Sequence, residues 1–302
     1  GSADLGIIVL DVPDNLSLRT PSVPLSEAIL LNTKKGLSSD FIQAIYEDSN
    51  HNVWVGTTGG GAIKCIPYVS PDRREAISKS VFKTYSTRQG LNYFNANAVF
   101  EDRESNIWIG TDIGLNQYRG ERFQIYSVAD SISSNLVWST MCDSEGNIWL
   151  GTNEGLSKIT FTPSQRNGEM VHTIKNYTTR DGLNSNVILA IHEDSNGNIW
   201  FGNGFGGVNM LPKGQTIFNS FTSRDGLPSD MIYDIKSDNK GNIWFGTKEG
   251  ATRYTPSTRI FRNYTVADGL GGNHIYRIFK DSKDLLWFGT LGGDLTVYDG
   301  TG

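Results

Sequence analysis

Three short segments carry the oxygen-rich pattern that begins one type of calcium-binding loop. They are DSEGN at 143–147, DSNGN at 194–198 and DNKGN at 238–242. Such a loop also needs a glutamate at its twelfth position, which binds the ion through both carboxylate oxygens. The twelfth residue from Asp194 is Phe205, and the twelfth from Asp238 is Glu249, which lies beyond the next hairpin. We therefore expect no metal site, and we interpret each aspartate as an acceptor for backbone N–H groups of a tight turn.

Acid–base catalysis requires a histidine with a positioned partner. The chain has four histidines, His51, His172, His192 and His274. Their spacing does not indicate a serine or cysteine nucleophile paired with a histidine and an acid. A lone histidine is more often structural than catalytic, so the sequence predicts no catalytic residue.

These segments belong to a repeated unit, which must position any site that the chain carries. The heptapeptide GNIWFGT at 241–247 has near-copies at five other places, and the tryptophans are Trp54, Trp108, Trp149, Trp200, Trp244 and Trp287. A Gly-Leu landmark stands 18 residues before each tryptophan, except in the third unit, where Ser131-Ile132 replaces it. A period near 43 residues is typical of solenoids, propellers and arrays.

Each unit has the pattern of four strands. Residues 226–265 contain MIYDIKSD and NIWFGT, joined by a turn, and then ATRYT and IFRNYT. Short runs rich in β-branched and aromatic residues, separated by Gly, Asn and Asp, indicate strands and hairpins. Four-stranded repeats of this length are typical of propeller blades. The sequence therefore predicts an all-β fold, a six-bladed β-propeller of four-stranded blades.

The sixth unit has a third strand, DLTVYD, and no obvious fourth. Before Gly36, the apolar residues Ala28 and Leu31 hold the two places that fourth strands elsewhere fill with aliphatic or aromatic side chains. We therefore expect residues 27–33 to pair with residues 294–298, so that the N-terminal strand closes the propeller. The predicted organisation is an irregular lead-in at 1–26, in which Gly1-Ser2 is a tag remnant, and a single propeller at 27–302.

Function is expected where the units differ, because scaffold positions are forced to be alike. Seven residues after the first landmark residue, the side chains diverge widely: Gln43, Asn97, Trp138, Leu189, Tyr233 and Tyr276. One position later, four units have alanine or serine, whereas the fifth and sixth have Asp234 and Arg277. Both positions lie on the first strand of the unit, which lines the central channel of a propeller.

Aromatic rings mixed with polar groups are what a sugar requires, because rings stack on its apolar faces and polar groups bind its hydroxyls. We predict that a neutral or mildly acidic oligosaccharide binds at the channel mouth, between the third and sixth blades. The predicted ligand-binding residues are Trp138, Tyr233 and Tyr276 for stacking, Asp234 and Arg277 for orientation, and His274, Asn97 and Phe205 beside them. Two alternatives stay open: the aromatic residues fill blade interfaces, or Asp234 and Arg277 form a structural salt bridge.

Charge and cysteine content exclude some partners. The net charge is −5, which argues against nucleic acid or an anionic membrane as the main partner. No apolar run approaches the roughly 20 residues that a spanning helix needs, so we expect no membrane insertion within this chain. Cys65 and Cys142 fall in non-neighbouring units, and we expect neither a disulfide nor a cofactor.

The segment YTTRDGLNSNVILAIHEDSNGNIWFGN at 177–203 resembles the two-component regulator propeller repeat. The resemblance extends over residues 28–299, and the third unit departs most, with Asp130-Ser131-Ile132 at the landmark and Cys142 in place of a glutamate. It implies the extracytoplasmic sensor half of a bacterial hybrid histidine kinase or a related signalling protein, many of which serve polysaccharide uptake. It also implies a periplasmic or extracellular location, as part of a longer membrane-anchored protein.

The leading prediction is a non-enzymatic propeller that binds a ligand or partner and recognises a carbohydrate. One alternative is a lyase or hydrolase that uses His274 with Asp234 or Arg277, because streptogramin lyases are propellers with a catalytic histidine at the mouth. Another is a purely structural interaction scaffold. The insertions at 65–80 and 161–170 are candidates for contact with a protein partner or for self-association.

Overall fold

The computed structural model describes residues 7–9, 29–71, 75, 78–120, 122–164, 170–281, 283–291 and 295–298. The described chain divides into two compact units. Unit one contains the described residues of 7–9, 29–148 and 159–174, and unit two contains those of 149–158 and 175–298.

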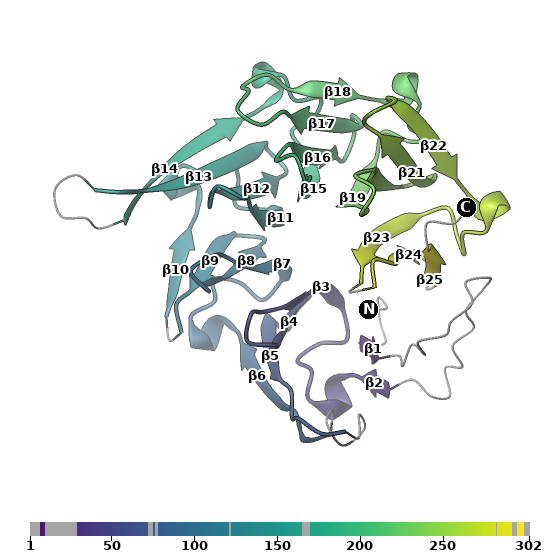
Figure 1. The fold of residues 1–302 in the computed structure, drawn as a ribbon. Coiled ribbons are helices and arrows are strands. Elements are labelled where there is room, and N and C mark those ends of the chain that lie inside the picture. The colour runs from purple at the N-terminus through teal and green to yellow at the C-terminus, as the bar shows by residue number, and fades with distance from the viewer. Residues whose placement is uncertain are drawn as a thin grey trace. The chain divides into compact units, whose positions relative to one another are not determined.

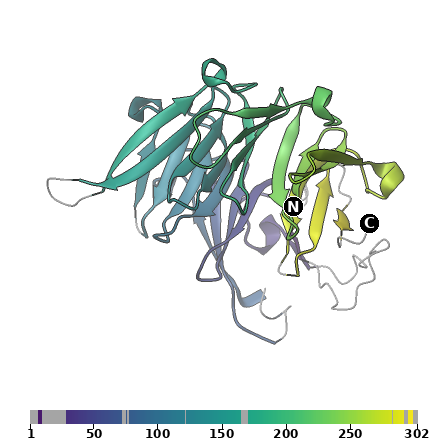
Figure 2. The same cartoon turned by 45° about the horizontal axis from the view of Figure 1, so that its top comes forward.

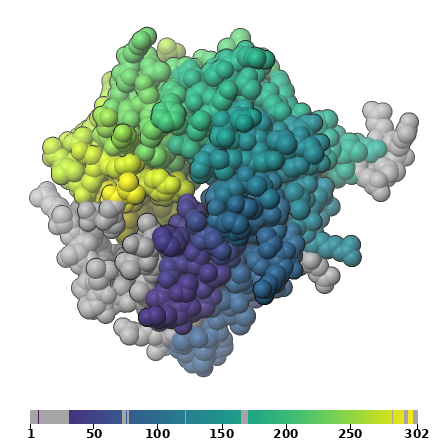
Figure 3. Space-filling model, turned by 180° about the vertical axis from the view of Figure 1, so that it is seen from behind, coloured from purple at the N-terminus to yellow at the C-terminus, as the bar shows by residue number. Residues whose placement is uncertain are grey.

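Unit one contains two complete four-stranded antiparallel sheets, whose strands lie in chain order (Figure 1). The first is formed by β3 (Ile42–Glu47), β4 (Val53–Thr57), β5 (Ala62–Ile66) and β6 (Val81–Tyr85). The second is formed by β7 (Ala96–Glu101), β8 (Ile107–Thr111), β9 (Gly114–Tyr118) and β10 (Phe123–Tyr126). Seen as filled atoms, these purple-to-blue sheets form one continuous body (Figure 3).

The third sheet contributes residues to both units. Its strands are β11 (Val137–Cys142), β12 (Ile148–Thr152), β13 (Leu156–Pro163) and β14 (Met170–Tyr177). β13 and β14 have eight residues each and project as a long hairpin (Figure 2). Residues 165–169 of the predicted contact insertion, like 72–74 and 76–77 of the other, lie outside the described residues.

Unit two contains the remaining blades. The fourth sheet is β15 (Ile188–Glu193), β16 (Ile199–Asn203), β17 (Val208–Leu211) and β18 (Asn219–Phe221). The fifth is β19 (Ile232–Ser237), β20 (Ile243–Thr247), β21 (Gly250–Thr255) and β22 (Ile260–Tyr264). The sixth is β23 (Ile275–Lys280), β24 (Leu286–Thr290) and β25 (Leu295–Tyr298). The prediction of an all-β, six-bladed β-propeller is confirmed.

The structure corrects the pairing expected for residues 27–33. β2 (Ile29–Leu31) pairs with β1 (Ile7–Val9), with Ile7 opposite Leu31. Leu31 and Tyr264 each stand five residues before a landmark glycine, so the two residues hold equivalent places. Tyr264, on a fourth strand, lies opposite Ala251 on a third strand. β1 therefore pairs with β2 as a third strand pairs with a fourth strand elsewhere. The apolar run at 7–9 therefore takes the place beside β2 that residues 294–298 were expected to hold. Residues 27, 28 and 294 lie outside the described residues.

Each fourth strand is followed by a single turn of 3₁₀ helix, and the landmark comes directly after that turn. After β18 the turn is Ser223–Asp225, where Asp225 accepts from the backbone N–H and the hydroxyl of Thr222. The first landmark residue follows with a positive φ, and Ser131 has a φ of 77° where the other units have glycine. No helix among the described residues is long and apolar enough to cross a membrane.

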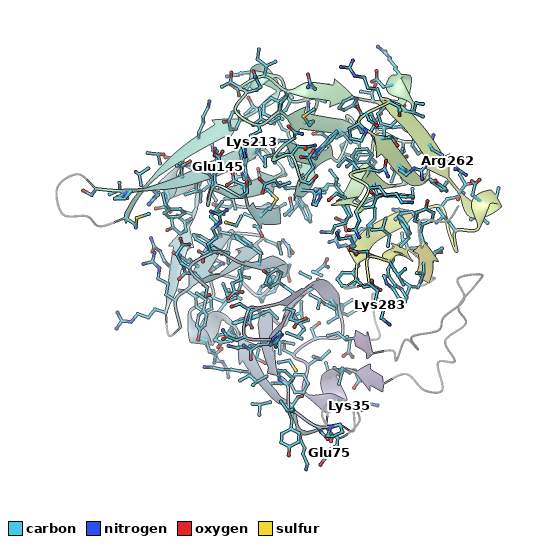
Figure 4. The ribbon with its side chains drawn as sticks, in the orientation of Figure 1. Lys35, Glu75, Glu145, Lys213, Arg262 and Lys283 are labelled. Carbon is cyan, nitrogen blue, oxygen red and sulfur yellow. The ribbon has the colours of Figure 1, made fainter. Side chains whose placement is uncertain are left out.

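Tryptophans pack each sheet of unit two against the next. Trp244 is 1% exposed and packs with Leu270, Ile275, Ile278 and Phe288 of the following sheet. Tyr264, on the fourth strand, lies 5.2 Å from the Trp244 ring, and the guanidinium of Arg262, which Figure 4 labels, lies 4.9 Å from the centre of the Tyr264 ring. The core of unit two therefore consists of aromatic and aliphatic layers between neighbouring sheets. We call the first strands of these sheets, β15, β19 and β23, the inner wall of unit two.

The aspartates of these turns accept a further hydrogen bond that the sequence does not predict. Asp238 accepts the backbone N–H groups of Lys240 and Asn242 at 2.9 Å, which confirms the turn interpretation. It also accepts the indole N–H of Trp244 at 2.9 Å. The same bond joins Asp48 to Trp54, Asp102 to Trp108, Asp194 to Trp200 and Asp281 to Trp287. Each turn is thus anchored to the buried ring of its own blade.

A half-buried histidine, His192, should make the stability of the fold sensitive to acid. His192 on β15 lies with its Nε2 2.9 Å from the Ser237 hydroxyl on β19. Burial, and next the neighbouring Lys236 ammonium, lowers the pKa of His192 to about 3. The unfolded chain therefore binds a proton between pH 6.5 and 3 that the folded chain does not, so stability present above pH 6.5 is lost as the pH falls through this window.

We expect His192→Gln to remove this part of the pH dependence. Between pH 7 and pH 5 the parent should lose about 2 kcal/mol of unfolding free energy more than the variant does. Urea unfolding followed by tryptophan fluorescence at both pH values measures the difference. Equal losses in parent and variant would show that His192 takes up its proton in the folded state.

Candidate ligand site on the inner strands

The positions at which the units diverge coincide with a β-bulge. In β19, Ile232 pairs with Thr247 and Asp234 pairs with Gly246, so Tyr233 has no partner across the ladder. The same one-residue shift occurs in four further first strands, at Gln43, Asn97, Leu189 and Tyr276. Bulges re-aim a side chain, and they are common next to functional sites. In these five blades the fold therefore offers one re-aimed side chain each, and the chain varies that residue.

The bulge also explains a spacing that the sequence displays. Ile232 and Ile235 are three residues apart, yet both have no exposed surface. In a regular strand two such residues would point to opposite faces of the sheet. The extra residue at Tyr233 brings both onto the face that packs against the preceding sheet. This spacing of aliphatic residues was the signal from which the bulge could have been inferred.

Five of the predicted site residues lie together in unit two. The Tyr233 ring is 4.8 Å from the His274 ring and 5.3 Å from the Tyr276 ring. The Arg277 guanidinium lies 4.8 Å from the centre of the Tyr276 ring, and its Nη1 donates to the carbonyl oxygen of Tyr276 at 3.2 Å. Tyr276 is 39% exposed. We call Tyr233, His274, Tyr276 and Arg277 the tyrosine shelf.

Asp234, the fifth of these residues, connects two strands of the inner wall. Its Oδ1 accepts the N–H of Ile235 at 2.9 Å, and its Oδ2 accepts the N–H of Ile278, on β23, at 2.8 Å. The salt bridge with Arg277, considered from the sequence, is therefore not the arrangement observed. The backbone N–H of the neighbouring strand attracts the carboxylate because it needs an acceptor at this point of the wall.

His274 stands just before β23, where its carbonyl oxygen accepts the N–H of Leu291 at 2.9 Å. Its ring atom Nε2 is buried, and it has no hydrogen-bond partner among the described residues. Burial, and next the Lys248 ammonium, lowers the pKa of His274 below its ordinary value. The imidazole is therefore neutral at neutral pH, with one ring nitrogen that a ligand group could satisfy.

The other three predicted residues have different surroundings. In unit one, Asn97 donates from Nδ2 to Asp112 at 2.9 Å and to the carbonyl oxygen of Val137 at 3.1 Å, so its amide joins β7 to β11. Trp138 follows on β11 and is 39% exposed. In unit two, Phe205 is 69% exposed on the β16–β17 turn. Among the described residues, no three histidine, cysteine or acidic side chains gather as a metal site would require.

Solved structures with this fold include two from signalling proteins. The extracellular domain of the hybrid two component system BT3049 from B. thetaiotaomicron has a TM-score of 0.74 and 24% identity, over 91% of this chain and 35% of that one. That of BT4673, from the same organism, has a TM-score of 0.58 and 23% identity, over 90% and 37%. The chain therefore spans about a third of the length of these domains.

An enzyme with a lower sequence identity to this chain also has the fold. A catalytically inactive variant of virginiamycin B lyase from Staphylococcus aureus, in which alanine replaces a histidine, was solved with quinupristin. It has a TM-score of 0.61 and 14% identity, over 84% of this chain and 79% of the lyase. At these identities, all three structures establish the fold alone.

The repeats themselves identify the family. Five segments match the model of the two component regulator propeller, at residues 36–59, 131–154, 182–205, 226–249 and 269–292. The second unit is not among them, although its sheet has the same strand order. No curated protein matches the chain. The chain belongs to the proteins that are built from two component regulator propeller repeats.

Proposed function

We propose that the chain is the ligand-sensing propeller of a bacterial signalling protein, and that it binds a carbohydrate at the tyrosine shelf. The observation that carries the proposal is the use of the bulge position. Two adjacent blades put a tyrosine there, and the exposed Tyr276 stands beside a guanidinium. A sugar ring is recognised by aromatic faces and by polar groups that bind its hydroxyls.

The signalling context is supported by the repeats and by two relatives of known structure. Those relatives are named as extracellular domains of hybrid two component systems. We extend this to a periplasmic or extracellular location, within a longer membrane-anchored protein. A protein partner, or a second copy of the chain, would then receive the signal through surfaces away from the shelf.

A lyase or hydrolase is the second candidate, and one observation favours it. His274 has a buried Nε2 without a described partner, and a histidine was replaced in the inactive lyase that shares this fold. Mass spectrometry of a polysaccharide and lactone panel, incubated with the protein, distinguishes enzyme from binder. A product that grows with time, and that His274→Ala abolishes, would make the chain an enzyme.

The binding proposal predicts a specific loss. Tyr276→Ala should weaken binding of the tightest oligosaccharide from a glycan array by about 1–3 kcal/mol, the range for exposed aromatic anchors. Calorimetric titration measures the affinity, and the melting temperature shows whether the fold is retained. Tyr68→Ala removes a similarly exposed tyrosine, at 45%, from outside the site and should leave affinity unchanged.

Two results would contradict the proposal. If the Tyr276 variant binds as tightly as the parent, the shelf is not the site, and the insertions at 65–80 and 161–170 become the better candidates. If no carbohydrate or other small molecule binds at all, the chain is a structural interaction scaffold.

A further inference from the structure

We infer that Asp234 is a positioning residue of the tyrosine shelf. It joins β19 to β23 and so holds the Tyr276 ring beside Tyr233, without contacting the bound oligosaccharide itself. The inference rests on the proposed function, because it says how the site of that function is kept in shape. It replaces the role in direct ligand orientation that the sequence predicts for Asp234.

The two tyrosines of the shelf need a restraint that the sheets do not give them. Tyr233 and Tyr276 each lie at a register shift, so neither has a residue opposite it on the second strand of its sheet. The hydroxyl of Tyr233 donates to the Sδ atom of Met231 at 2.8 Å, which ties this ring to its own segment of the chain. Tyr276 is 39% exposed, so its place beside Tyr233 depends on how β23 is held against β19.

Asp234 follows Tyr233 directly and supplies that restraint. Its Oδ1 accepts the N–H of Ile235 at 2.9 Å, so the carboxylate is fixed to its own strand. Its Oδ2 accepts the N–H of Ile278, two residues after Tyr276, at 2.8 Å. A bond between a carboxylate and a backbone N–H is charge-assisted, and it therefore holds the two strands more strongly than a neutral hydrogen bond would.

A second bond connects the same two strands in the opposite direction. Arg277 holds the place on β23 that Asp234 holds on β19, and its Nη1 donates to the carbonyl oxygen of Tyr233 at 3.4 Å. Three of the other units have alanine at this place, and a methyl group makes no hydrogen bond. In the remaining unit the hydroxyl of Ser139 has no partner among the described residues. The fold therefore does not require such a connection, and the chain has it where the two tyrosines meet.

A double-mutant cycle with Tyr276 tests the inference. In calorimetric titrations with the tightest array oligosaccharide, Asp234→Ala should weaken binding about fivefold, because the sugar must then order a ring that the free protein no longer holds. In the Tyr276→Ala background the same change should weaken binding less than about twofold, since the ring through which Asp234 acts is already gone. Three other units have alanine at this place, so the variant should fold.

A spectroscopic readout needs no sugar. With meta-fluorotyrosine in place of tyrosine, the fluorine NMR resonance of Tyr276 is assigned by its loss in Tyr276→Phe. In Asp234→Ala this resonance should narrow and move toward the shift of free fluorotyrosine, as expected for a side chain that moves on a shorter timescale. Asp225→Ala is the matched control, because Asp225 also accepts two hydrogen bonds, but from Thr222 outside the shelf. It should leave both the affinity and the resonance at their parent values.

Three results would overturn the inference and leave the proposed function standing. Equal losses of affinity from Asp234→Ala in both backgrounds would show that Asp234 contacts the sugar directly. An unchanged affinity, or an unchanged resonance, would mean that its bonds do not position Tyr276. An equal loss of affinity in Asp225→Ala would show that general destabilisation is the cause. If no carbohydrate binds, the proposed function fails, and the fluorine resonance alone decides whether Asp234 positions the ring.

Discussion

Asp238→Ala should lower the unfolding free energy by about 3 kcal/mol, because it leaves several buried donors without an acceptor. The carboxylate accepts from the backbone N–H groups of Lys240 and Asn242, from the Asn242 side chain and from the Trp244 indole. Asn242 is 7% exposed and Trp244 is 1% exposed, so water cannot replace the lost acceptor without opening the blade. Chemical unfolding followed by fluorescence measures the change.

A second aspartate, in the turn between the fourth and fifth sheets, supplies the control. Asp225 also accepts two hydrogen bonds, from the backbone and hydroxyl of Thr222, but it does so in an exposed turn. Asp225→Ala should therefore cost only about 1 kcal/mol, as is usual for exposed caps. Similar losses of unfolding free energy in the two variants would mean that the hydrogen bond to the tryptophan adds no stability. The aspartate would then recur in each unit only because the turn requires it.

Gly207→Ala should destabilise the protein by about 3 kcal/mol, whereas Gly214→Ala should cost about 1 kcal/mol. Both glycines have a φ of +72°, so the conformational penalty of an L side chain is shared. A Cβ at Gly207 would lie 2.1 Å from the carbonyl oxygen of Phe221, and a Cβ at Gly214 would meet nothing within 4 Å. The difference in destabilisation between the two variants therefore measures the steric cost of the close approach between the start of β17 and the end of β18.

Differential scanning calorimetry and urea unfolding of both variants measure this difference. Equal losses would indicate that the backbone around Phe221 moves aside at little cost. In that case the glycine before the third strand would be retained only for its φ.

The blades could be predicted because their signals are local and repeated. The alternation around Trp244, the glycine turns and the constant spacing of the landmark each indicate the same four strands. The bond from Asp238 to Trp244 was missed, although the interval of six residues recurs in the other units. A turn aspartate has backbone donors of its own, so nothing in the sequence requires an indole partner.

Pairings between distant segments could not be predicted in the same way. The strand at 7–9 is too short to show a period, and its partnership with β2 is visible only through the register of Ile7 and Leu31. The expected partner, residues 294–298, was chosen because it lacked a neighbour, which is a weaker argument than a register.

The candidate site was chosen from the sequence by the differences between units, but its geometry could not be predicted in this way. Tyr233, His274 and Tyr276 were predicted as neighbours, and the structure brings their rings together. One alternative left open by the sequence paired Asp234 with Arg277, because opposite charges on adjacent blades attract. It bonds instead to the Ile278 N–H, since a backbone donor on the neighbouring strand is closer and fixed in place. The bulge at the variable positions is indicated only indirectly, by the three-residue spacing of buried aliphatic residues such as Ile232 and Ile235, because a single sequence does not display ladder hydrogen bonds.

Hydrogen–deuterium exchange with and without the tightest oligosaccharide tests the central claim, that the bulged strands β19 and β23 present the ligand-binding side chains. A ligand seated on the shelf restrains the local opening through which their backbone amides exchange. The account predicts increased protection concentrated in peptides that cover 230–237 and 273–280, and no change in peptides that cover the insertions at 65–80 and 161–170. Protection confined to either insertion, with β19 and β23 unchanged, would contradict it.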